Sequence, residues 1–163
     1  MKELVNLDEV LAMAVQIEHN AAAFYREIGE RYGNGASKDI LEDLARMEDS
    51  HEQAFRKMRE EAGGAGSSSG VNLSDEGGLY LWAVSGGGYR VEGSRGVVES
   101  LTGDETIQDI LKLGLDLEKE AVLYYLGIRD IVSSQAAKDT ISQVIEQEKQ
   151  HIVVFAEMLR KHQ

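Results

Sequence analysis

A glutamate and a histidine three residues apart, Glu48 and His51, lie in the stretch "ARMEDSHEQAF" (45–55), whose apolar residues recur at helical spacing. Residues three or four apart share one face of a helix, so this pair lies on the side that faces the core. A carboxylate and an imidazole are costly to bury unless a partner compensates them. One such pair is a weak signal, because chance supplies many of them in an acidic helical chain.

The same pair recurs 100 residues later as Glu148 and His151. The offset of 100 also relates other similar residues without a gap: Glu18 and Glu118, Tyr25 and Tyr125, Phe55 and Phe155, Met58 and Met158. Each Glu-x-x-His pair follows a glutamate that lies 30 residues earlier on the apolar face of its own helix. The sequence therefore contains two copies of one helical hairpin.

Apolar residues at helical spacing predict four helices, at about 7–32, 37–61, 104–132 and 134–161. We expect Ser37 to cap the second helix, Thr102 and Glu105 to form a capping box before the third, and Ser133 or Ser134 to begin the fourth. These helices predict an all-α fold, an antiparallel four-helix bundle made of two repeated hairpins.

The segment between the hairpins has a different composition. "GGAGSSSG" (63–70) is typical of a flexible linker, and 71–101 is irregular apart from "LYLWAV" (79–84). That apolar piece predicts either a short helix beginning near Ser74 or a short strand. We interpret 63–101 as a long Gly-rich crossover within a single domain that spans residues 1–163.

Composition excludes several classes of function. The 163 residues include no cysteine, which rules out disulfides, thiolate metal sites and iron–sulfur clusters within them. The formal net charge of -12 argues against nucleic acid and anionic membrane surfaces as partners. The sequence has neither a membrane-spanning apolar stretch nor the pattern of a signal peptide at its start, so we expect a soluble cytoplasmic protein.

If the hairpins pack with pseudo-two-fold symmetry, four carboxylates and two imidazoles meet in the core: Glu18, Glu48, His51, Glu118, Glu148 and His151. Two divalent cations would balance four buried carboxylates, whereas unpaired burial would be prohibitive. The same ligand set occurs in di-metal carboxylate bundles. Oxygen and imidazole ligands suit iron or manganese, and zinc can occupy such a site. We expect two iron ions per chain.

In the expected arrangement, Glu48 and Glu148 bridge the two metals. Glu18 and His51 are terminal ligands of one metal, and Glu118 and His151 are terminal ligands of the other. Tyr25 and Tyr125 lie two helical turns beyond Glu18 and Glu118. They pack in the core, or they act as candidate catalytic residues by bonding a metal-bound carboxylate or by transferring one electron.

At these residues the sequence resembles the rubrerythrin-like proteins of the ferritin-like superfamily. The resemblance is carried by "IEHNAAAFY" (17–25), "MEDSHEQAF" (47–55), "LEKEAVLYY" (117–125) and "QEKQHIVVF" (147–155), and it covers both hairpins. It implies a ferritin-like domain with a non-haem di-iron centre, held by the six residues named above, that reacts with dioxygen or hydrogen peroxide.

Two departures from the rubrerythrin pattern change the expected chemistry. The chain has no cysteine for a rubredoxin domain, so electrons would come from a separate donor protein. It also lacks a further glutamate one turn from Glu118, since Glu120 points to a different face. The symmetric ligand set is closer to a ferritin-type ferroxidase centre.

Two classes of function remain open from the sequence. The first is a di-iron oxidoreductase that reduces peroxide or dioxygen, or oxidises Fe(II). The alternative is a non-catalytic bundle, metal-binding or metal-free, that acts as a dimeric interaction scaffold. We expect a homodimer in either case.

Overall fold

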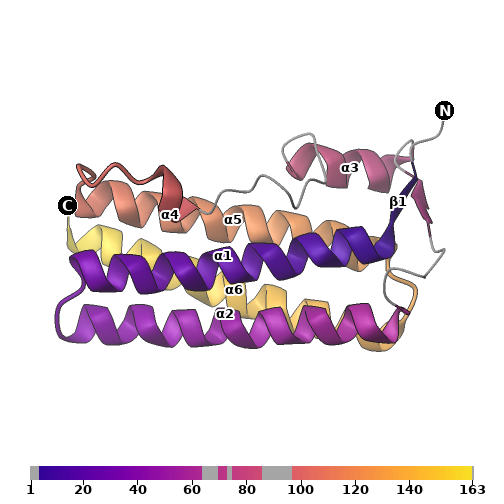
Figure 1. The fold of residues 1–163 in the computed structure, drawn as a ribbon, viewed down its shortest axis with the longest axis horizontal. Helices are drawn as coiled ribbons and strands as arrows, with labels where there is room; N and C mark the ends of the chain where they lie inside the picture. The colour runs from indigo at the N-terminus through magenta and orange to yellow at the C-terminus, as the bar shows by residue number, and fades with distance from the viewer. Residues whose placement is uncertain (1–3, 64–69, 73–74, 86–96, 163) are drawn as a thin grey trace.

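Four long helices dominate the structure, a computed structural model that describes residues 4–63, 70–72, 75–85 and 97–162. They are α1 (Leu7–Tyr32), α2 (Ala36–Glu61), α5 (Ile107–Ile131) and α6 (Gln135–Lys161). α1 and α2 form one antiparallel hairpin, α5 and α6 form the other, and the two hairpins lie side by side as a bundle (Figure 1). The predicted all-α bundle of two repeated hairpins is confirmed. A single domain over residues 1–163 stays a prediction.

The crossover contains three short elements in its described part. Strand β2 (Gly70–Asn72) pairs antiparallel with β1 (Leu4–Asn6), just ahead of α1. Helix α3 (Glu76–Val84) packs on α5, and α4 (Val97–Ser100) contacts α1 (Figure 1). The structure thus settles 79–84 as helix, and it adds a two-stranded ladder that the sequence analysis did not predict. The expected start near Ser74 lies outside the described residues, and the Asp75 side chain caps α3 by accepting from the Gly78 N–H.

One of the predicted helix caps is wrong and another is confirmed. Helix α2 has Gly35 at its N-cap position with no side-chain cap, so Ser37 lies inside the first turn. Gly35 has φ of 47°, a conformation that glycine adopts readily, and the chain turns there instead of at the serine. The expected start of the last helix is confirmed, because the Ser134 side chain caps α6 by accepting from the Ala137 N–H.

The capping box before α5 lies one turn later than predicted. Thr106 and Asp109 form it reciprocally, and the helix begins at Ile107. Glu105 does accept hydrogen bonds from the Thr102 backbone and hydroxyl. Gly103 between them has φ of 92°, however, so this segment is a loop and not a helical turn.

Two apolar clusters fill the bundle, one toward each end. The first contains Val10, Leu11, Phe55, Tyr125, Ile128 and Ile141 among others, and the second contains Phe24, Tyr25, Ile28, Leu41, Ile110 and Phe155 among others. Along each long helix, the residues between the two clusters include the predicted ligands. The core is therefore two apolar regions separated by a polar layer. None of the helices in the described ranges is long and apolar enough to cross a membrane.

Close packing of α5 against α6 depends on Gly114. A Cβ atom at this position would lie 2.5 Å from Cε1 and 2.8 Å from Cζ of the Phe155 ring. Phe155 is fully buried, so its ring cannot swing into solvent. In contrast, a Cβ at the buried Gly29 of α1 would meet its nearest neighbour, Cβ of Leu41, at an ordinary 3.6 Å.

We predict that Gly114→Ala lowers the free energy of unfolding by about 1–2 kcal/mol, because overpacking outweighs the gain in helix propensity. Gly29→Ala is the matched control, and it should raise the free energy of unfolding by about 0.5 kcal/mol, since it gains propensity without a clash. Urea denaturation followed by circular dichroism measures both. Equal effects of the two substitutions would contradict this account of the packing.

Candidate metal centre

The six predicted ligands lie together in the polar layer at the middle of the bundle. Every one is buried, with at most 3% of its surface exposed: Glu18, Glu48, His51, Glu118, Glu148 and His151. They come from all four long helices, with one glutamate each from α1 and α5 and a Glu-x-x-His pair each from α2 and α6. The spacing of three residues puts both members of each pair on the face that points inward.

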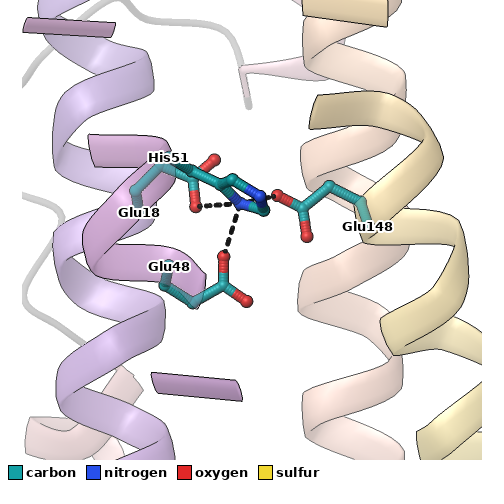
Figure 2. Close-up of side chains that lie close together, drawn as sticks. All are labelled: Glu18, Glu48, His51 and Glu148. Carbon is teal, nitrogen blue, oxygen red and sulfur yellow. Dashed lines mark hydrogen bonds and ion pairs between the residues drawn. The ribbon is translucent and has the colours of Figure 1, made fainter. Parts of the chain in front are cut away.

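Three carboxylates surround one ring nitrogen of His51. Nδ1 lies 2.9 Å from Glu148 Oε1, 3.1 Å from Glu48 Oε2 and 3.6 Å from Glu18 Oε2 (Figure 2). A ring nitrogen carries at most one hydrogen, so it can donate well to only one of three oxygens. The arrangement is that of ligands around a shared cation.

His151 repeats this arrangement in the second hairpin. Its Nδ1 lies 2.8 Å from Glu48 Oε1, 3.0 Å from Glu148 Oε2 and 3.3 Å from Glu118 Oε1. The two imidazole rings are stacked, with their centroids 5.9 Å apart. The two hairpins thus provide two equivalent sets of ligand atoms side by side.

The ligand atoms fall into two groups that share two residues. In each group the candidate atoms lie within 4.8 Å of one another: Glu18, Glu48, His51 and Glu148 in one, and Glu48, Glu118, Glu148 and His151 in the other. Glu48 and Glu148 belong to both groups, which is the geometry that bridging carboxylates need. The buried Glu/His cluster therefore has the form of a dinuclear metal site.

The four carboxylates differ in the direction in which their pKa values are shifted. Burial and the nearby Glu148 carboxylate raise the pKa of Glu18 well above its usual value, and burial does the same for Glu118. Burial would also raise the pKa values of Glu48 and Glu148, but the adjacent imidazoles of His151 and His51 outweigh it and lower both. Glu18 and Glu118 therefore favour the protonated form more than Glu48 and Glu148 do.

The two histidines are held in the charged form. Burial alone would lower their pKa values, yet the surrounding carboxylates overcome this effect. They raise the pKa of His151 to about 12 and move that of His51 in the same direction. Protons on the histidines and cations at the site would therefore compensate the same carboxylates.

Protons do not satisfy this site completely. Several buried ligand atoms have no hydrogen-bond partner among the described residues: Glu48 Oε1, both carboxylate oxygens of Glu148, and both ring nitrogens of His151. An ion pair at 2.8–3.0 Å reaches some of them, but without the angle that a hydrogen bond requires. Orphaned oxygen and imidazole atoms around one centre are the donor set that iron or manganese takes, so the residues present fit a metal pair.

Tyr25 and Tyr125 bond to the terminal glutamates across the bundle. The Tyr25 hydroxyl donates to Glu118 and the Tyr125 hydroxyl donates to Glu18, so each tyrosine reaches the opposite hairpin. Their rings also pack in the apolar clusters, with Tyr125 4.8 Å from the Phe55 ring. The alternatives of core packing and carboxylate bonding therefore both hold.

Gln147 is a site residue that the sequence analysis missed. Nε2 of His51 lies 2.7 Å from the Gln147 side-chain oxygen, which leaves Nδ1 to face the carboxylates. Met47 is the residue of the first hairpin that corresponds to Gln147, and its thioether is a weak acceptor. Nε2 of His151 has no hydrogen-bond partner within the described part of the chain. The difference between Met47 and Gln147 at equivalent positions of the repeat is the sequence signal from which this residue could have been identified.

A cavity of about 480 Å³ reaches the site between α1 and α5. Four of the six predicted ligands border it, namely Glu18, Glu48, Glu118 and Glu148. The C-terminal end of α3 covers one side. Glu120, which the sequence places on another face of its helix than Glu118, also lines the cavity.

The chain was compared with known families and proteins. The rubrerythrin family matches residues 9–72, which cover α1 and α2. None of the curated proteins is similar enough to count as a match.

Solved structures resemble the whole chain. A ferritin-like diiron-carboxylate protein from Thermotoga maritima is 24% identical, with a TM-score of 0.76 and 100% of both chains covered. Two structures of KatB, a manganese catalase from Anabaena, are each 20% identical and have TM-scores of 0.65 and 0.67. In both comparisons, 99% of this chain and 76% of the catalase chain are covered.

These likenesses show a shared fold, and the family match covers the first hairpin. The chain has no cysteine with which to build a rubredoxin iron site. The findings agree with what the paired motifs indicate: the first hairpin matches the rubrerythrin family, and the whole chain shares the fold of a ferritin-like diiron-carboxylate protein.

Proposed function

We propose that the protein is a non-haem di-iron oxidoreductase that reduces hydrogen peroxide or dioxygen. The observation that carries the proposal is the convergence of three carboxylates on Nδ1 of each buried histidine, with Glu48 and Glu148 common to both groups. The rubrerythrin match over the first hairpin supports the same reaction class. The fold shared with a manganese catalase makes manganese the second metal to test.

Each ligand has a distinct role in this proposal. Glu48 and Glu148 would be shared by the two ions, Glu18 and His51 would complete the ligands of one, and Glu118 and His151 would complete those of the other. Two ferrous ions together would supply the two electrons that cleavage of one peroxide O–O bond needs.

Tyr25 and Tyr125 hold the terminal glutamates in place. Because burial raises the pKa of both phenols, they stay protonated and donate hydrogen bonds to the carboxylates. The cavity between α1 and α5 gives the oxidant a route to the site. Electrons return from a separate donor protein, and the chain works as a cytoplasmic homodimer.

Fe(II) oxidation is the nearest competing reaction, since the symmetric ligand set is close to that of a ferroxidase centre. A metal-free or purely structural bundle is the alternative class. The orphaned ligand atoms argue against that class, because protons could balance the charge of a metal-free core but would leave these atoms without hydrogen bonds.

Anaerobic titration should show that the protein binds about two Fe(II) ions per chain, as the two ligand groups imply. Peroxide or oxygen added to the loaded protein should then produce ferric absorption, with faster turnover for one oxidant. Glu48→Gln and Glu148→Gln should each reduce binding below one ion, because each removes a shared ligand. Glu157→Gln, at an exposed position of the same helix as Glu148, is the control and should bind two ions. Unchanged metal content in both bridging variants would exclude the proposed site.

Metal binding should weaken as the pH falls, because the cations compete with protons. The pKa values of Glu18, Glu118, His51 and His151 are all raised, so protons compete with the cations for these ligands. Each divalent ion then displaces protons, and its apparent affinity rises with pH by about tenfold per pH unit for each proton displaced. Calorimetry in buffers of different ionisation enthalpy counts the released protons. Release of fewer than about one proton per ion would contradict the charge distribution described above.

Gln147 should favour binding at the His51 half of the site. In Gln147→Leu, His51 loses the partner that orients it, so one of the two binding steps should weaken by ~10–100-fold. Met47→Gln is the reverse change, and it should tighten the other step by giving His151 an acceptor. Stepwise calorimetric titration with Mn(II) separates the two affinities. Equal loss at both steps in Gln147→Leu would refute a role confined to His51.

A further inference from the structure

The cavity beside the metal centre is larger than the proposed oxidants need. Its volume is about 480 Å³. A water molecule takes up about 30 Å³ of liquid, and a peroxide or dioxygen molecule, with two oxygen atoms, is of the same order. Pockets that bind small organic ligands have volumes of about 300–1,000 Å³. The size of the cavity is therefore that of an organic binding site.

The walls of the cavity are mostly apolar and follow the internal repeat. Ile17 and Ala21 of α1 face their equivalents Leu117 and Ala121 of α5, and Tyr124 adds an aromatic surface. Glu18, Glu48, Glu118 and Glu148 form the end of the cavity at the metal centre. A molecule bound here would pack its apolar body on both hairpins and lie next to the ions.

The lining carries negative charge and, among the described residues, no positive charge. Beyond the four ligand carboxylates it includes Glu120, and no lysine, arginine or histidine. Two divalent ions would balance the four ligands, which leaves the charge of Glu120. An anionic molecule whose charge lies away from the ions would therefore meet the Glu120 carboxylate and no cationic side chain, whereas a neutral or cationic molecule would not be repelled there.

The repeat breaks where Glu120 lines the cavity. The equivalent residue of the first hairpin is Asn20, so an amide and a carboxylate come from the two sides. Ala83 and Val84 of α3, with Ser85 just after it, line the cavity from a segment that has no counterpart in the repeat. The apolar walls are thus alike in the two hairpins. The polar residues at 20 and 120 and the cover by α3 differ between them, and these features could select a ligand.

We propose that this cavity binds a small, mostly apolar organic molecule, neutral or cationic, beside the metal centre. The apolar walls hold the body of the molecule, and the Glu120 carboxylate accepts a hydrogen bond from its polar end. The inference deepens the proposed function and rests on it for the two neighbouring ions. It adds a second ligand class to a site otherwise assigned to a small oxidant.

Three probes of one shape test the proposal: 2-phenylethylamine, 2-phenylethanol and phenylacetate. Each is titrated into the Zn(II)-loaded protein, which is redox-silent, and binding is followed by NMR chemical shifts. We expect the amine and the alcohol to bind at least tenfold more tightly than phenylacetate. In Glu120→Gln the preference for the amine over the alcohol should fall several-fold. Tighter binding of phenylacetate than of both others would overturn the proposal.

A matched pair of substitutions on α1 locates the binding site. Ala21→Phe fills the cavity and should weaken binding of both preferred probes at least tenfold. Ala23→Phe makes the same change at an exposed position two residues away and should leave binding unchanged. Neither residue is a predicted ligand, so zinc content should stay at two ions in both. If Ala21→Phe does not fold, Ala83→Phe narrows the cavity from α3 instead. Equal binding by the filled and the control variants would overturn the proposal.

The outcomes separate this proposal from the function on which it rests. If two zinc ions bind and none of the probes does, the organic site is refuted and the metal centre stands. If the probes bind as expected to a protein that takes up no metal, the metal proposal fails and the cavity is still a ligand site.

Discussion

Burial of four carboxylates in one layer of the core is the constraint on which the rest of the structure depends. Glu18, Glu48, Glu118 and Glu148 are each almost completely buried, and two imidazoles lie among them. Four negative charges cannot stay unpaired in such a place. Without metal, burial and neighbouring carboxylates favour protons on Glu18, Glu118 and the two histidines. Two divalent ions would supply four positive charges and would give partners to the oxygens that have no hydrogen bond.

The apolar parts of the bundle keep this layer in register. A large apolar cluster lies on each side of it, and the tyrosines that belong to these clusters bond to the terminal glutamates. Tyr25 of the first hairpin reaches Glu118 of the second, and Tyr125 reaches Glu18 in return. Because each bond joins the two hairpins, a shift of one hairpin against the other would break both bonds. The packing therefore fixes the spacing of the ligands before any metal binds.

The features that the two repeated hairpins share could be predicted from the sequence. The offset of 100 identified the six candidate ligands, because helical periodicity decides which side chains share a face. Local end signals were less reliable: Ser37 and Thr102 have good capping chemistry, but glycines with positive φ decide where the chain turns. Gln147, the β1–β2 ladder and the cavity depend on contacts between elements distant in sequence, which periodicity does not report.

The differences between the hairpins carry as much information as the repeat. Symmetry would give the two halves of the site equal ligands and equal surroundings. The ligands obey it, yet Gln147 corresponds to Met47, Glu120 corresponds to Asn20, and α3 covers the cavity from outside the repeat. Each difference lies next to the ligands and leaves the ligands themselves unchanged. Two equivalent sets of candidate ligands thus lie in unlike surroundings, and ions bound there would differ in their neighbours.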